Sequence, residues 1–172
     1  MRPSASNTVA TTTKWLSRTA VLLAMTVAIQ LLGLPQLVTG PVVNAMLLLT
    51  ALTVGPSSGV LVGICTPFIA LYRGILLPPL APMVPFIGLS NAAFVIVFSV
   101  LRKRQVYVGL AAAALAKFLI LSTAVRFIIT VPEPIAYAMQ IPQLVTAVTG
   151  GVVALIIRDL LRRWSLDDGT RS

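Results

Sequence analysis

Histidine is absent from this chain, cysteine occurs once, and only four of the 172 residues are acidic. The single cysteine, Cys65, lies in an apolar run, so a disulfide framework and a cysteine metal site are both excluded. Catalysis would need a nucleophile with a base, or acids that hold a metal, and the apolar segments supply neither histidine nor acid. We therefore expect no enzyme, no resident metal and no cofactor.

Charge is scarce as well. Charged residues make up 10% of the chain and hydrophobic residues 58%, whereas soluble domains are about a quarter charged. Most of the chain is therefore expected to have lipid as its solvent. The net charge of +9 could favour nucleic acid, but the basic residues lie at the ends of apolar runs and not in a patch with aromatic residues. We expect a multi-pass protein of the plasma membrane with no nucleic-acid partner.

The apolar runs predict an all-α membrane protein, a compact bundle of six transmembrane helices. The expected helices are about 15–33, 41–54, 59–76, 85–101, 106–131 and 135–157. They form one domain over residues 14–163, between a polar tail at 1–13 that is expected to be disordered and a frayed tail at 164–172.

The second expected helix, 41–54, is short, with a length of about 21 Å, which is less than the usual hydrocarbon thickness. Three explanations are open: the bilayer thins there, the helix begins in the preceding loop, or the segment is re-entrant. With this helix counted, six spans place the basic clusters 14/18, 102–104 and 158–163 on one side of the membrane. The positive-inside rule then makes that side, and both termini, cytoplasmic.

Polar side chains within the apolar runs gather in the outer half of this expected bundle. They are Gln30, Asn44, Arg73, Asn91, Arg126, Gln140 and Gln143, with Thr66 and Lys117 deeper. Polar groups in lipid usually face the bundle interior or a wet cavity. These nine residues therefore predict one substrate pocket that opens to the outside. Its charge is positive, so a ligand with a carboxylate or phosphate would suit it.

Each of these residues has a plainer interpretation. Arg73 and Arg126 could extend to lipid headgroups, and Asn44 and Asn91 could only bond neighbouring helices. Lys117 has no acidic partner on any expected helix, and it could snorkel, face the pocket, or be held by backbone carbonyls that Pro67 or Pro142 frees. Lys117 and Arg126 lie about 180° apart around one helix, which predicts that they do not share a site.

Three small residues recur at every fourth position of the first helix: Ala20, Ala24 and Ala28. Such a stripe allows another helix to approach closely. The partner could be a helix of this chain or of another protein.

Four segments together resemble the substrate-binding S components of energy-coupling factor (ECF) transporters. They are RTAVLLAMTVAIQ, TPFIALYRGILLPPLAPMVPFIGLSNA, AALAKF and PQLVTAVTGG. The resemblance covers roughly residues 15–163 and favours the members whose substrate is unassigned. It implies binding of a vitamin or similar micronutrient at the outer face, with residues 34–40 as a lid. It also implies docking through Ala20, Ala24 and Ala28 on a membrane scaffold (T) subunit that works with two cytoplasmic ATPase subunits.

An alternative function is a self-sufficient small secondary transporter or channel. That function needs polar groups through the full depth of the membrane, whereas the inner half of the expected bundle carries only Ser and Thr away from its end.

Overall fold

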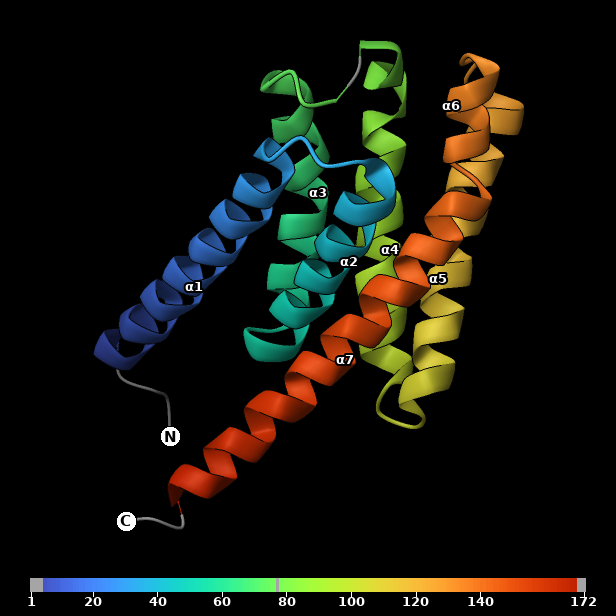
Figure 1. Cartoon of the computed structure of the whole chain (residues 1–172). Helices are drawn as coiled ribbons and strands as arrows, with labels where there is room; N and C mark the ends of the chain where they lie inside the picture. Colours follow the sequence, from blue (N-terminus) through green and yellow to red (C-terminus); the bar gives the residue numbers. More distant parts are fainter. Residues whose placement is uncertain (1–4, 77, 170–172) are drawn as a thin grey trace.

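The computed structural model describes residues 5–76 and 78–169, and in these ranges the fold is helical without any strand. The elements in chain order are α1 (Ala5–Leu31), α2 (Gln36–Thr53), α3 (Pro56–Tyr72), the 3-10 helix η1 (Pro78–Met83), α4 (Val84–Leu101), α5 (Val106–Thr123), the π-helical turn η2 (Ala124–Ile128), α6 (Glu133–Ala138) and α7 (Ile141–Gly169). Figure 1 shows them as one bundle in which α1 and α7 incline relative to α3, α4 and α5. The prediction of an all-α fold is confirmed.

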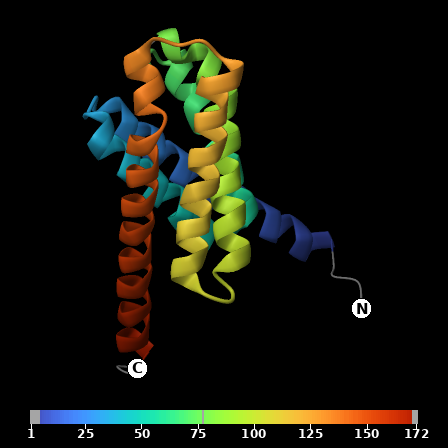
Figure 2. The same ribbon diagram turned by 90° about the vertical axis from the view of Figure 1, so that its right-hand side faces the viewer.

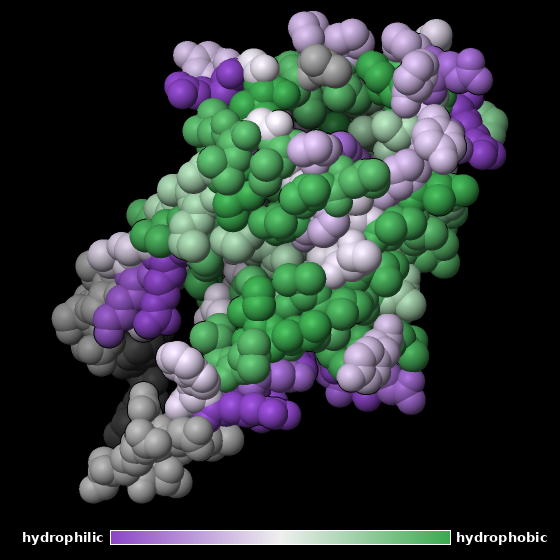
Figure 3. Space-filling model, in the orientation of Figure 1, coloured by the Kyte–Doolittle hydropathy of each residue, from purple (hydrophilic) through white to green (hydrophobic). Residues whose placement is uncertain are grey.

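Four helical segments are long and apolar enough to cross a membrane. These are Gln36–Thr53, Pro78–Leu101, Val106–Ile128 and Glu133–Trp164. The helix α3 is apolar but has only 17 residues, and α1 is not among the four. On the face shown in Figure 3, a hydrophobic band separates hydrophilic residues at the two ends of the bundle. The structure thus supports a membrane protein, with four clear candidate spans.

Both predicted tails are helical where the structure describes them. The helix α1 begins at Ala5 and α7 continues to Gly169, so the expected disorder at 1–13 and fraying at 164–172 are wrong for residues 5–13 and 164–169. Residues 1–4 and 170–172 lie outside the described residues. Both helices run past the apolar stretch because no proline or glycine interrupts the polar residues next to it.

The short second helix begins in the segment that precedes it. It starts at Gln36 rather than at residue 41, which gives 18 residues and makes it the first of the four candidate spans. Pro41 therefore lies inside α2 and not at its first position. Of the three explanations left open by the sequence, a start within the predicted loop 34–40 is the one observed.

The last predicted helix, 135–157, is broken into α6 and α7 at Met139 and Gln140. Pro142 accounts for the break, because proline has no N–H for the preceding helical turn and is tolerated only in the first turn of a new helix. The fifth predicted helix also ends early: α5 becomes the π-helical η2, and an extended segment follows from Ile129.

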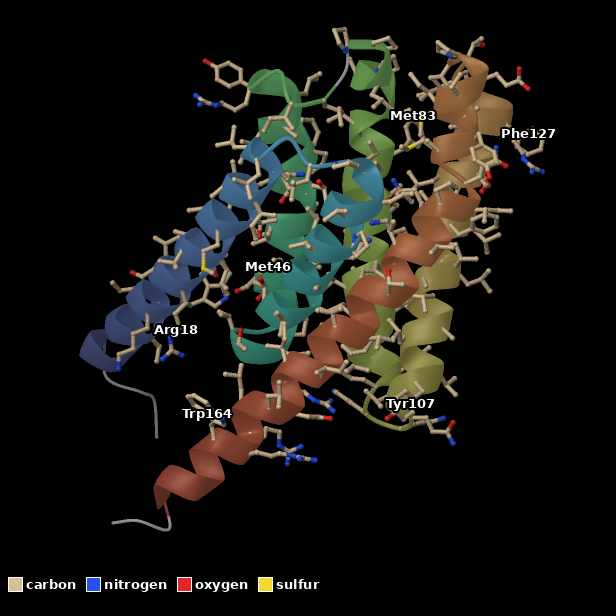
Figure 4. All side chains as sticks on the ribbon, in the orientation of Figure 1. Arg18, Met46, Met83, Tyr107, Phe127 and Trp164 are labelled. Atoms are coloured by element: carbon tan, nitrogen blue, oxygen red, sulfur yellow. The ribbon has the colours of Figure 1, made fainter. Side chains whose placement is uncertain are left out.

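The start of α1, the turn between α4 and α5, and the end of α7 lie at one end of the bundle (Figures 1 and 2). We call it the basic end, because it carries the clusters 14/18, 102–104 and 158–163. Figure 4 shows Arg18, Tyr107 and Trp164 there, with Met83 and Phe127 at the other end. The helices α2, α4 and α7 run toward the basic end, and α3 and α5 run away from it.

Glycine allows α7 to lie directly against α2. These two helices contact each other more extensively than any other pair of described elements. A Cβ atom at Gly150 would overlap the carbonyl oxygen of Pro41 and would lie 2.7 Å from Cβ of Asn44. The backbones of α2 and α7 can therefore keep their observed separation only if residue 150 has no side chain.

The α1 helix packs on α2 and α3 through one face only. Thr19 on that face is buried and donates a hydrogen bond from Oγ1 to Oγ of Ser58 at 2.8 Å. Ala20, Ala24 and Ala28 are all exposed on the opposite side. The alanine stripe is therefore not a packing surface within this chain.

We expect the substitution Gly150→Ala to destabilise the bundle by about 1–3 kcal/mol, the usual effect of overpacking. Gly88→Ala is the matched control, because a Cβ at Gly88 in α4 would meet its nearest neighbours at 3.6 Å, an ordinary contact. Thermal unfolding in detergent measures both variants. Equal midpoints for Gly150→Ala and Gly88→Ala would contradict the close approach of α2 and α7.

Candidate functional site

A proline in α3 orients the side chain at the centre of the candidate site. Pro67 lies inside α3 and has no N–H to donate to the carbonyl of Gly63, one turn earlier. That free carbonyl accepts a hydrogen bond from Nδ2 of Asn91 in α4 at 3.0 Å. The bond fixes which way the Asn91 amide points, so that its oxygen Oδ1 faces α5.

The Asn91 oxygen faces the side chain of Lys117, which lies in α5. Its Nζ donates to Oδ1 of Asn91 at 2.7 Å and to Oδ1 of Asn44 at 2.6 Å, and it lies 5.7 Å from the centroid of the Phe94 ring. The side chain is only 4% exposed, which excludes the snorkelling interpretation. We call Asn44, Asn91 and Lys117 the polar triad. The carbonyl freed at Pro67 contributes through Asn91 rather than by binding Lys117 directly.

A cavity of about 100 Å³ lies next to the polar triad. Six of the nine predicted substrate-binding residues line it: Gln30, Asn44, Thr66, Asn91, Lys117 and Gln143. They come from α1, α2, α3, α4, α5 and α7. These six polar residues from separate helices therefore line one cavity. What the pocket binds is a separate question.

Several polar groups on the cavity wall have no partner among the described residues. Lys117 has three N–H donors and uses two. Asn44 directs its oxygen to Lys117, and its Nδ2 has no hydrogen bond within the described chain. The amide of Gln143, 7% exposed, is likewise without a partner there, and Oε1 of Gln30 is buried without one. A buried polar group without a hydrogen bond destabilises by about 1–3 kcal/mol. The unused N–H groups of Lys117, Asn44 and Gln143 are therefore suited to an incoming acceptor, whereas the Gln30 oxygen would need a donor.

Lys117 is the one charged residue among those that line the cavity. The described chain brings no carboxylate to it, since the ion pair found among the described residues joins Arg158 to Asp159 at the basic end. A cavity with an ammonium and amide donors, and without a carboxylate, favours an anionic or carbonyl-rich molecule.

One face of α2 supplies wall residues that the sequence interpretation missed. Gln36, Thr39 and Gly40 line the cavity together with Val43 and Asn44, and their spacing of three and four residues places them on one side of a helix. The sequence prediction assigned residues 36–40 to a loop, which hid this periodicity. The spacing of three and four residues, continued toward the N-terminus from Asn44, was the signal that could have identified Gln36, Thr39 and Gly40.

Three predicted residues lie outside the cavity. Arg73 is exposed just after α3, where Gly74, at φ 70°, turns the chain in the left-handed conformation that ends many helices. Arg126 in η2 is exposed and donates from Nη2 to Oε1 of Gln140 at 2.8 Å. Gln140 in turn donates from Nε2 to the carbonyl of Ala136 at 3.0 Å. The pocket-lining interpretation is wrong for all three.

The separation of Lys117 from Arg126 is as expected. Lys117 bonds to α2 and α4, whereas Arg126 bonds to the break between α6 and α7. The near-opposite directions that helical spacing predicts for these two side chains place one inside the bundle and the other at its surface.

A buried apolar layer lies between the cavity and the basic end. Following each helix from the polar triad in that direction leads to buried residues of one hydrophobic cluster, which include Leu47, Leu48, Phe94, Phe98, Ala113 and Ala114. Their exposed fractions are all 0%. A second apolar cluster, built around Met83, Leu121, Ala124 and Met139, lies at the cavity end beside α6. The polar triad therefore sits between two apolar clusters.

Comparison of the chain with protein-family models, with curated proteins and with solved structures gives no match. The likeness to S components of ECF transporters thus stays a resemblance carried by the sequence segments given above.

A double-mutant cycle tests the polar triad. We expect Asn91→Leu to destabilise the protein by about 2–3 kcal/mol, because it leaves both the Lys117 ammonium and the Gly63 carbonyl short of a partner. Adding Lys117→Met removes the buried charge, and apolar replacement of a buried polar pair is close to neutral. The double variant should therefore recover at least half of the loss.

Thermal unfolding of the two single variants and the double variant in detergent supplies the cycle. Additive effects of Asn91→Leu and Lys117→Met would contradict a direct contact between these side chains, since independent sites add within about 0.5 kcal/mol.

Proposed function

We propose that this chain is the membrane-embedded substrate-binding subunit of an importer of the energy-coupling factor type. It captures a small molecule with an acidic group, such as a vitamin or similar micronutrient, and acts without enzymatic activity of its own. The observation that carries the proposal is the cavity beside Lys117, whose walls hold buried polar groups without partners. A structural cluster would pair these groups within the protein.

The distribution of charge supports an orientation in the membrane. The clusters 14/18, 102–104 and 158–163 share the basic end, and both the start of α1 and the end of α7 lie there (Figure 1). By the positive-inside rule this end faces the cytoplasm. The cavity then opens toward the outside, where an importer meets its substrate. In this proposal α1 and α3 complete the set of six spans.

The apolar layer favours a binding subunit over a self-sufficient channel or secondary transporter. Buried Phe94 and Phe98 with Leu47 and Leu48 fill the bundle between the cavity and the basic end. Passage of a polar solute needs a polar or water-filled route through the full depth of a membrane protein. Without such a route, release to the cytoplasm depends on another protein that moves or reshapes this one.

The exposed alanine face of α1 supports docking on a membrane scaffold subunit. Ala20, Ala24 and Ala28 face away from the bundle, and small residues allow close helix contact in lipid. This face is available because Thr19 and Thr26 occupy the buried side of α1. In the proposed assembly the scaffold binds two cytoplasmic ATPase subunits that power transport.

Ligand capture can be tested by native mass spectrometry of the purified protein. We expect an added mass that is retained by the wild type and by Arg73→Gln, because Arg73 lies outside the cavity. In Lys117→Met the loss of one charged hydrogen bond should weaken binding by about tenfold to a hundredfold. Retention to the same extent in Lys117→Met would refute the cavity as the binding site.

Docking can be tested by co-purification with the scaffold and ATPase subunits. We expect Ala24→Trp to abolish the complex while the isolated protein unfolds at the same temperature, because Ala24 is exposed. Met25→Trp is the control: Met25 is also exposed and lies about 100° around the helix from Ala24. An intact complex with Ala24→Trp would remove the docking role from this face.

A further inference from the structure

The basic end of the bundle contains a cleft of about 420 Å³ that has no part in the cavity beside Lys117. It lies between the end of α2, the turn after α4, and α7. Its walls are Leu52, Thr53, Arg102, Arg158, Leu161 and Arg162. Three guanidinium groups thus converge from two separate elements on a single hollow.

The positive charge of this cleft is only partly balanced. Arg158 and Arg162 are four residues apart and so lie on the same face of α7. Arg158 pairs with its neighbour Asp159 at 2.7 Å, whereas Arg102 and Arg162 have no ion pair within the described chain. Like charges at this spacing repel each other. An anion between them would relieve that repulsion.

Arg102 provides an independent sign of a missing ligand. Its Nε is buried and has no hydrogen-bond partner among the described residues. Arg102 is also held in place, because it ends α4 through a hydrogen bond from its N–H to the carbonyl of Phe98 at 2.9 Å. A Cβ at Gly109 would lie 2.9 Å from the Arg102 nitrogen, so α5 packs directly on this turn. The backbone from which this unpartnered donor extends is therefore held by the fold.

We propose that this cleft binds a phosphate group. Planar guanidinium groups donate paired N–H bonds that match phosphate oxygens, and three of them exceed what a single carboxylate can accept. Leu52 near the end of α2 and the exposed Leu161 of α7 give the cleft apolar walls beside the arginines. That arrangement fits the headgroup of an anionic phospholipid with its acyl chains along the helices, and free phosphate shares the same chemistry.

Native mass spectrometry of protein released from mixed micelles tests the lipid source. The micelles contain equal amounts of phosphatidylcholine and phosphatidylglycerol. We expect one phosphatidylglycerol to be retained several-fold more often than phosphatidylcholine. The double variant R102Q/R162Q should lower this retention by about tenfold, as expected for the loss of charged hydrogen bonds.

The matched control is K103Q/R104Q. It also removes two positive charges at the basic end, both from the turn that carries Arg102, but Lys103 and Arg104 are exposed and do not line the cleft. It should retain phosphatidylglycerol like the wild type. If R102Q/R162Q does not fold, Arg162→Gln alone serves, because Arg162 is exposed at the end of the bundle; it should still lower retention.

A second arm distinguishes the sources of phosphate. Protein in phosphatidylcholine micelles is titrated with inorganic phosphate and followed by phosphorus NMR line width. Broadening that R102Q/R162Q abolishes, without retention of phosphatidylglycerol, would assign the cleft to a soluble phosphate. Equal retention of phosphatidylglycerol by the two double variants, with no phosphate broadening, would overturn the proposal.

Discussion

Pro67 in α3 lacks a backbone N–H, and the hydrogen bonds beside the cavity depend on that absence. Because Pro67 cannot bond to the carbonyl of Gly63, that carbonyl takes the amide of Asn91, and the Asn91 oxygen is then available to the Lys117 ammonium. Asn44 completes the set from α2, and Gly150 in α7 leaves room for the backbone that carries it. Five helices thus hold a buried charge, and the proline sets the part of the arrangement that runs through α3, α4 and α5. Without these partners, a lysine in this position would destabilise the fold strongly.

Much of the fold could be predicted from the sequence, because long apolar runs in a chain with few charges have no alternative to helices in lipid. Helix ends were harder to predict. Polar residues 5–13 and 164–169 continue α1 and α7, since nothing in them stops a helix. Pro41 marked a helix start in the prediction but lies inside α2. In both cases the packing of the rest of the helix had more influence on where the helix ends than the local sequence signal had.

For the candidate site, the depth of each residue along its helix could be predicted from the sequence, but the direction of its side chain could not. Asn44, Asn91 and Gln143, which the sequence places in the outer half of the bundle, all line the cavity. The same prediction includes Arg73 and Arg126, which are exposed, and the half-buried Gln140, which bonds to Arg126 outside the cavity. Depth along a helix follows from sequence position, whereas rotation about the helix axis depends on which neighbours pack against it. A helix that is apolar on all sides gives little information about that rotation.

The groups without partners around the cavity also determine which molecules the resting protein rejects. A cation that enters meets the Lys117 ammonium and the free amide donor of Asn44, and among the described residues the unbonded side-chain acceptors there are the neutral amide oxygens of Gln30 and Gln143. Such a molecule would lose its hydration and gain repulsion in a region of low dielectric constant. The cavity therefore discriminates by the sign of charge before shape has any effect. In the proposed orientation, in which the cavity faces the outside of the cell, sodium, potassium and amines would be kept out without any moving part.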